Sequence, residues 1–338
     1  MNLKDSKYKG YALIKEMLET VEVMRHFDPA CAAPFCDEIK KSKGLFLTGE
    51  GSSRIFPAKK ALYERMRKNY SVPVMTEGAT QAMEYDLSDF AVFAASNSGQ
   101  TKEVVRLLSK LTGQGHKRIF GLTANENTKL EQLAVRTNIL KCGKEEAVAA
   151  TKSVVEQALF YDALQHLLER QDLGFRDNAA GAFEQALTMK IDESLVQKIA
   201  AAPVIWFAGR NNGVAEELAL KTNEITRKRS GYLEGTYAVH GIEEVMNRDE
   251  VLIWINPFRD EEEKFLEVLE KGVGLTVIAV SAEKTRFNTV MIPASGDFSP
   301  YTELAAGWNI LIETGLSLGI NLDKPTRARK VGNEYLPS

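Results

Sequence analysis

Residues 90–108 have the sequence FAVFAASNSGQTKEVVRLL. The unbroken apolar run 90–95 is typical of a strand buried on both faces of a parallel sheet. Residues 101–109 have helical spacing, with apolar Val104, Val105 and Leu108 on one side and charged residues on the other. The stretch therefore predicts a buried strand that leads directly into an amphipathic helix.

The junction between strand and helix is Ser96-Asn97-Ser98-Gly99-Gln100-Thr101. A helix N-terminus carries free backbone N–H groups and a partial positive charge, and Gly99 lets a ligand come close to the backbone. Capping a helix needs one hydroxyl, whereas this loop offers three. We interpret the loop as a binding site for a tetrahedral anion that uses no lysine.

Apolar runs and helical patterns alternate along both halves of the chain, which predicts α/β architecture with parallel sheets and helices on both faces. Strands are expected at 44–48, 72–76, 90–95, 118–123 and 138–142, and again at 203–208, 251–255, 275–280 and 290–292. A long helix is expected at 145–170, and polar helices at 175–200 are expected to link the halves.

Ligands of such sheets bind beyond the carboxyl ends of the strands. The loops 49–53, 96–101 and 124–128 all follow predicted strands, so we expect them to line one crevice. The second half lacks the hydroxyl-rich loop. It has Asn256-Pro257-Phe258-Arg259 after the strand 251–255, so that half must contribute something else.

The composition excludes several classes of function. The 338 residues include 43 Lys and Arg against 46 Asp and Glu, a net charge of −3 that argues against a nucleic-acid partner. No apolar run is long enough for a membrane span, and no signal core precedes the first helix, so we expect a cytoplasmic protein. Cys31, Cys36 and Cys142 are expected to be free thiols. The four histidines show no ligand spacing, so neither metal nor cofactor is expected.

Three further places in the second half carry chemistry-bearing residues. Lys221 and Glu224 are three residues apart and share a helix face, which alone indicates only a surface ion pair. His240 lies in a small, apolar stretch before Gly241, where a lone histidine is usually structural. The basic segment 323–331 alone indicates a frayed terminus.

Together these places resemble one family. The loop 96–101 resembles the Ser-x-Ser-Gly-x-Thr phosphate loop of the sugar isomerase (SIS) domain, and the chain resembles two-SIS-domain proteins such as the isomerase half of glucosamine-6-phosphate synthase. The matching spacings are three residues from Lys221 to Glu224, sixteen from Glu224 to His240 and five from Pro325 to Lys330. The segments 49–53 and 145–153 also match, and the likeness covers about residues 40–335.

The resemblance implies two flavodoxin-like SIS domains at 41–175 and 195–322, N-terminal helices at 1–40 and a closing tail at 323–338. It implies proton transfer by Glu224 between C1 and C2 of an open-chain sugar, with His240 in ring opening, Lys330 closing over the substrate and Lys221 in the catalytic group. It also implies a homodimer with shared sites. The substrate-binding positions that it implies are Ser52, Ser53, Ser96, Asn97, Ser98, Gly99, Thr101, Ala150 and Lys152.

The departures leave the reaction open. Residues 236–242 lack the family's glutamate and proline around the histidine, and Ala150 replaces a serine that contacts the sugar. A glutaminase domain is not expected. The expected substrate is a small phosphorylated or sulfonated sugar. The expected activity is aldose–ketose isomerisation or amino-sugar-phosphate deamination, with a deglycase or a non-catalytic sugar-phosphate sensor as alternatives.

Overall fold

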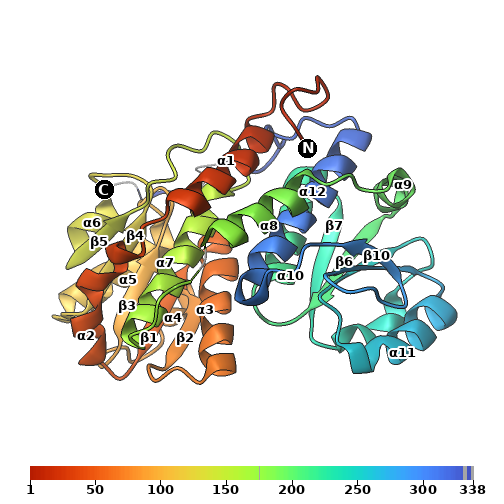
Figure 1. Cartoon of the computed structure of the whole chain (residues 1–338). Coiled ribbons are helices and arrows are strands. Elements are labelled where there is room, and N and C mark those ends of the chain that lie inside the picture. Colours follow the sequence, from red (N-terminus) through yellow and green to blue (C-terminus); the bar gives the residue numbers. More distant parts are fainter. Residues whose placement is uncertain (175, 330–332, 336–338) are drawn as a thin grey trace. The chain divides into compact units, whose positions relative to one another are not determined.

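The computed structural model describes residues 1–174, 176–329 and 333–335. The chain forms two compact units, each named here by its strands. The β1–β5 unit comprises residues 22–145, 150–176 and the end of the chain from 329, and the β6–β10 unit comprises 1–21, 146–149 and 177–328. Figure 1 shows the elements of both.

The β1–β5 unit is built on a five-stranded parallel sheet in the order β2-β1-β3-β4-β5. Its strands are β1 (Leu45–Gly49), β2 (Val74–Gly78), β3 (Ala91–Ala95), β4 (Ile119–Thr123) and β5 (Arg136–Ile139). Its helices are η1 (Pro29–Phe35), α2 (Cys36–Lys40), η2 (Gly51–Ser53), α3 (Ile55–Lys68), α4 (Ala79–Ala82), α5 (Lys102–Gly113), α6 (Lys129–Leu133) and α7 (Lys152–Leu168). This is the flavodoxin-like strand order.

Side chains that alternate along β3 divide between the two faces of this sheet. Val92 packs with apolar side chains of α4, α5 and α6 in one cluster. Phe93 points the other way and lies 5.1 Å from the ring of Phe35 in η1 and 5.5 Å from that of Phe160 in α7. The expectation of helices on both faces is confirmed.

The β6–β10 unit repeats this plan, with a parallel sheet in the order β10-β9-β8-β6-β7. Its strands are β6 (Val204–Gly209), β7 (Arg229–Glu234), β8 (Val251–Ile255), β9 (Thr276–Ser281) and β10 (Asn288–Met291). Its longer helices are α8 (Arg176–Thr188), α9 (Glu193–Ala201), α10 (Val214–Thr226) and α12 (Ser299–Ser317), and α1 (Ala12–His26) begins in this unit. Its shorter helical segments are η3 (Tyr237–Val239), η4 (Ile242–Val245), η5 (Arg259–Glu261), α11 (Glu262–Phe265), η6 (Leu266–Val273) and η7 (Gly296–Phe298).

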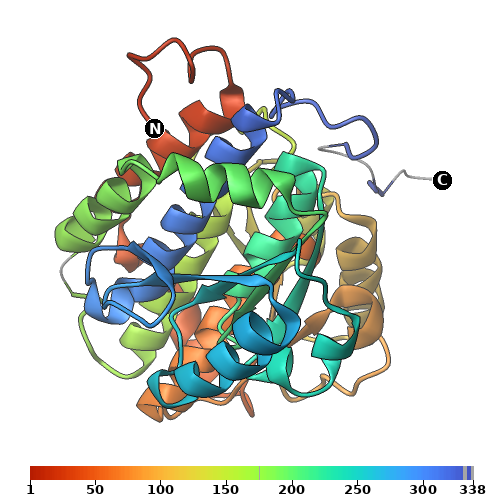
Figure 2. The ribbon, with the colours of Figure 1, turned by 90° about the vertical axis from the view of Figure 1, so that its right-hand side faces the viewer.

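Helices cover this sheet on both faces as well. Trp254 of β8 stacks on Phe265 of α11 with ring centroids 3.6 Å apart, so the segment 262–273 covers one face (Figure 2). Helices α10 and α12 pack together on the other. They approach closely because α12 has Gly307, where a Cβ would lie 2.3 Å from Leu218 of α10.

Several predicted elements differ from those in the structure. The helix expected from 145 begins only at Lys152, because residues 145–151 wrap around a buried carboxylate. Strand β5 lies at 136–139 instead of 138–142. Helix α8 does more than link the halves, since buried Phe183 contacts Trp308 edge to face. Strand β7 was not predicted, because it is an edge strand with mostly polar and half-exposed residues.

Candidate functional site

The loop between β3 and α5 is held by its own hydroxyls. Ser96 Oγ lies 2.8 Å from Thr101 Oγ1, and Ser98 Oγ accepts the backbone N–H of Gln100 at 3.1 Å. Gly99 has φ +65°, and a Cβ there would lie 2.4 Å from the side chain of Thr128. Both the turn and the close approach therefore require glycine at this position.

Three loops meet at this edge of the sheet. Residues Ser52 and Ser53 in η2 follow β1, and β1 pairs directly with β3. The loop after β4 bonds to the hydroxyl-rich loop twice, since the N–H of Ala124 donates to the Asn97 carbonyl and that of Leu130 to the Gly99 carbonyl. The parallel register thus brings the residues expected to bind an anion to the same edge of the sheet.

The buried carboxylate of Glu145 holds the hydroxyl-rich loop in place through hydrogen bonds. Glu145 accepts hydrogen bonds from the Asn97 amide at 3.0 Å, from the Thr151 N–H at 2.7 Å and from the Ser153 hydroxyl at 2.6 Å. The carboxylate lies at the N-terminus of α7, where the helix dipole favours negative charge. Glu145 was not among the predicted site residues, although its spacing to Thr151 and Ser153 was visible in the sequence.

The two predicted positions at the start of α7 have different surroundings. Ala150 is half-buried, directly before the Thr151 amide that bonds to Glu145. Lys152 is buried, and its ammonium donates to the Lys144 carbonyl at 3.2 Å. This ammonium therefore helps to hold the loop that contains Glu145.

The end of the chain pairs with the hydroxyl-rich loop. Glu334 forms an antiparallel bridge with Thr101, the Lys102 N–H donates to the Asn333 carbonyl at 3.0 Å, and the Tyr335 N–H donates to the Gln100 carbonyl at 2.8 Å. No pattern in the sequence predicts this bridge. Lys330, predicted to close over the substrate, lies outside the described residues.

In the β6–β10 unit, Lys221 of α10 is fully buried, in contrast to the solvated ion pair that the bare spacing indicated. Its ammonium lies 2.8 Å from a Glu224 oxygen and 3.2 Å from a Glu217 oxygen. Burial lowers the pKa of Lys221, but Glu224 and Glu217 outweigh it and leave the pKa above its usual value. The lysine is therefore charged at neutral pH.

Of the three residues in this cluster, Glu224 is the one that reaches the surface. The side chains of Lys221 and Glu217 are 0% exposed, whereas that of Glu224 is 22% exposed. Arg227 caps this end of α10 by donating to the Glu224 and Ile225 carbonyls at 2.8 and 2.7 Å. The Glu224 carboxylate is thus fixed in direction and open on one side.

His240 lies in an exposed loop after η3, and its N–H donates to the Tyr237 carbonyl at 3.2 Å. The next residue, Gly241, has φ +109°. The predicted residues therefore divide between the units. The hydroxyl-rich loop, Ala150 and Lys152 belong to the β1–β5 unit, and Lys221, Glu224 and His240 belong to the β6–β10 unit.

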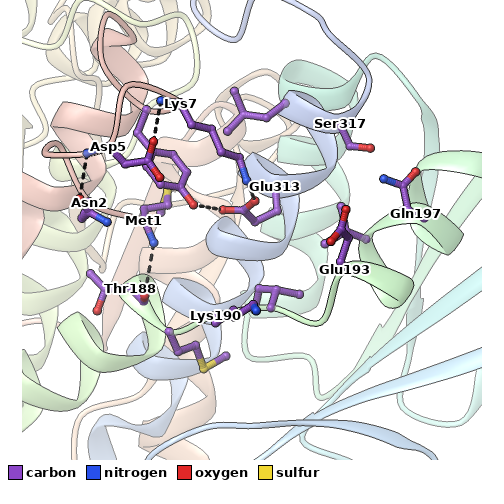
Figure 3. Close-up of a pocket in the computed structure, with 15 residues that line it drawn as sticks. Met1, Asn2, Asp5, Lys7, Thr188, Lys190, Glu193, Gln197, Glu313 and Ser317 are labelled. Atoms are coloured by element: carbon purple, nitrogen blue, oxygen red, sulfur yellow. Dashed lines mark hydrogen bonds and ion pairs between the residues drawn. The ribbon is translucent and has the colours of Figure 1, made fainter.

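A cavity of about 820 Å³ lies beside α12 in the β6–β10 unit. Figure 3 shows that Lys7 of this lining is paired with Glu313, and the Tyr8 hydroxyl also donates to Glu313 at 2.5 Å. These contacts attach the N-terminal segment to α12.

The described part of the chain contains no helix long and apolar enough to cross a bilayer. Over the same residues, no group of three or more His, Cys, Asp or Glu is placed to bind a metal ion. The three cysteines are free, as predicted, and burial raises the pKa of Cys142 above its usual value.

A model of the SIS domain family matches residues 38–167, the region that contains the hydroxyl-rich loop and Glu145. Residues 38–167 form a SIS domain. The resemblance inferred from the loop is thereby confirmed for these residues, and the second parallel sheet repeats the same α/β fold. A search of curated proteins returns no match to the sequence.

Solved structures share the fold over nearly the whole chain. The C-terminal domain of glucosamine-fructose-6-phosphate aminotransferase from Francisella tularensis has a TM-score of 0.78 at 19% identity, covering 95% of this chain and 100% of that one. Tagatose-6-phosphate ketose/aldose isomerase from Escherichia coli has a TM-score of 0.78 at 17% sequence identity, and the match covers 96% of this chain and 99% of that one. Glucosamine-6-phosphate deaminase from Thermotoga maritima has a TM-score of 0.70 at 21% sequence identity, and the match covers 93% of this chain and 98% of that one.

Replacing Glu145 tests its role as the anchor of the SIS-domain loop. Glu145→Gln puts an amide N–H₂ where a carboxylate oxygen accepts hydrogen bonds, so we expect the free energy of unfolding to fall by about 1–3 kcal/mol. Chemical denaturation measures this change. The neighbouring exposed Glu146→Gln is the matched control and should stay within about 0.5 kcal/mol of the parent. Equal stability of the two variants would show that Glu145 does not anchor the loop.

Proposed function

We propose that this protein is an enzyme that binds a phosphorylated sugar and moves a proton between C1 and C2 of its open chain. The observation that carries the proposal is the hydroxyl-rich loop at the start of α5, in a SIS domain, with Gly99 in the left-handed conformation. Three hydroxyls and a helix N-terminus suit the oxygens of a tetrahedral anion. A sulfonate group has the same geometry and remains an alternative anchor.

The solved structures named above support the substrate class. Their names refer to tagatose 6-phosphate and glucosamine 6-phosphate, and to isomerase and deaminase activities. Isomerisation and deamination share one proton-transfer step through an enediol or an enolamine. The proposal therefore covers both reactions, and a panel of hexose and hexosamine 6-phosphates followed by proton NMR would separate them.

We assign the base to Glu224. Its carboxylate is open on one side and held on the other by the buried ammonium of Lys221, so it has a fixed direction without being enclosed. It would take the proton from the carbon next to the carbonyl and return it to the neighbouring carbon. Lys221 acts in this scheme as a positioning residue, and we assign ring opening to His240 and closure over the substrate to Lys330.

Removing hydroxyls from the SIS-domain loop should weaken binding of the anionic group. Ser98→Ala combined with Thr101→Ala removes charge-assisted hydrogen bonds worth roughly 1.5–3 kcal/mol each. Calorimetry with a hexose 6-phosphate should show at least about a tenfold loss of affinity. Ser109→Ala, an exposed hydroxyl near the other end of α5, is the matched control. Unchanged affinity in the double variant would exclude the loop from the site.

Glu224→Gln keeps the size of the side chain and abolishes its basicity. Loss of a positioned base costs roughly 10² to 10⁴ in rate, so exchange of the substrate C1 or C2 proton with deuterated solvent should slow by that factor. Binding of the sugar phosphate should persist, and Glu267→Gln, an exposed carboxylate in η6, should exchange at the parent rate. Parent-rate exchange in Glu224→Gln would leave the chain a sugar-phosphate sensor or place the base elsewhere.

We also propose a homodimer in which His240 acts in the site of the partner subunit. The support is its place in an exposed loop that follows the edge strand β7, where a second copy can reach it. Inactive Glu224→Gln and inactive His240→Ala proteins, mixed under conditions that exchange subunits, should regain part of the activity. A mixture that stays inactive after mass spectrometry has confirmed exchange would contradict the shared site.

A further inference from the structure

The β6–β10 unit has a cavity of about 470 Å³ at the carboxyl ends of its strands. Arg210 follows β6, Asn256 follows β8 and Ser281 ends β9, and all three line the cavity together with residues of α12. Strands β6 and β8 correspond to strands 1 and 3 of the flavodoxin-like order, and ligands of that fold bind at their switch point. The cavity therefore occupies the position that the hydroxyl-rich loop occupies in the β1–β5 unit.

A buried carboxyl group in the lining lacks half of its hydrogen bonds. Glu303 of α12 is 2% exposed, and its Oε1 accepts from the Asn256 amide at 2.8 Å. Its Oε2 has no hydrogen-bond partner among the described residues. An unpaired buried oxygen is costly, so a ligand group that bonds to it would be favoured. Burial raises the pKa of Glu303 to about 7, against smaller lowering effects of Asn256 and Arg210, so the group can accept or donate near neutral pH.

The two arginines of the lining are already engaged. The guanidinium of Arg210 stacks 4.3 Å from the Phe258 ring and donates to the Asn256 carbonyl. Arg259 donates to the Lys284 carbonyl at 2.8 Å and binds Glu283. Arg259 is thus paired with a carboxylate, and Arg210 is held against Phe258 and one carbonyl. Since no hydroxyl-rich helix start follows β8 and the Glu303 carboxyl lines the cavity, the lining suits a neutral ligand better than a phosphate.

The remaining polar groups suit vicinal hydroxyls. The Glu303 carboxyl, the Asn256 amide and the hydroxyls of Ser281 and Ser299 line the cavity beside apolar Ile292. Carboxyl and amide groups can each donate or accept hydrogen bonds, as hydroxyls also do. A volume of about 470 Å³ is in the range of small-molecule sites.

We propose that this cavity binds a neutral polyhydroxylated molecule of sugar size, through Glu303 and Asn256. The site is separate from the proposed base. Arg210 precedes the N-terminus of α10, and Glu224 is ten residues beyond Val214, which is about 15 Å along the helix. The proposal does not depend on the proposed activity and can hold if Glu224 proves not to be a base.

The test uses the whole chain and three probes, namely sorbitol, glucose and inorganic phosphate. Saturation-transfer NMR should show contact of sorbitol or glucose with the protein, and an equal concentration of phosphate should not displace it. Glu303→Met removes both carboxyl oxygens, and Ala282→Trp fills the cavity from an exposed lining position. Glu303→Met should weaken the transfer at least about fivefold, the loss expected for a missing hydrogen bond. Ala282→Trp should weaken it at least as much, because the indole occupies the space of the polyol.

The controls separate this site from the SIS-domain loop. The exposed Glu244→Gln and the double variant Ser98→Ala, Thr101→Ala should both keep the parent signal, and melting temperatures confirm that every variant is folded. The proposal is overturned if neither polyol receives saturation, or if the signal survives in both folded cavity variants. It is also overturned if phosphate displaces the polyol and the double variant loses it, because the polyol would then lie in the SIS-domain loop.

Discussion

The candidate site in the SIS domain depends on the hydrogen bonds that the buried carboxylate of Glu145 accepts. This carboxylate accepts hydrogen bonds from the first turn of α7 and from the Asn97 side chain, so one residue fixes both the start of a helix and the loop expected to bind an anion. The charge is tolerated because the helix dipole and the donated hydrogen bonds replace its lost hydration. Without that anchor, the segment 145–151 would have no reason to leave the helix that its composition favours.

The two units share one strand order but carry different residues after the equivalent strands. Parallel pairing brings the carboxyl ends of strands 1 and 3 together in each unit, and residue type then decides what that edge can bind. In the β1–β5 unit the edge carries serine and threonine at a helix N-terminus, which suits an anion. In the β6–β10 unit it carries Arg210, Asn256 and the half-satisfied Glu303, which suits hydroxyls.

The architecture was predictable because apolar periodicity and turn residues are local properties. The run 90–95 and the loop 96–101 determined a buried strand, a helix start and a candidate anion site. The second apolar series determined a second sheet, and the loop motif was enough to identify the SIS domain, which the family match confirms. Edge strand β7 was not predicted, because a strand with one free edge and half-exposed faces has no apolar run in its sequence.

Contacts between distant residues were decided only by the tertiary structure. The spacing of Lys221 and Glu224 suits an exposed pair as well as a buried one, and only the packing of α10 against its neighbours in the β6–β10 unit decides that Lys221 is fully enclosed. Likewise, no local pattern shows that Glu145 binds Asn97, that residues 333–335 pair with the loop 100–102, or that Glu303 meets Asn256. Sequence determines which side chains follow each strand, whereas burial and hydrogen-bond partners depend on which segments the fold brings together.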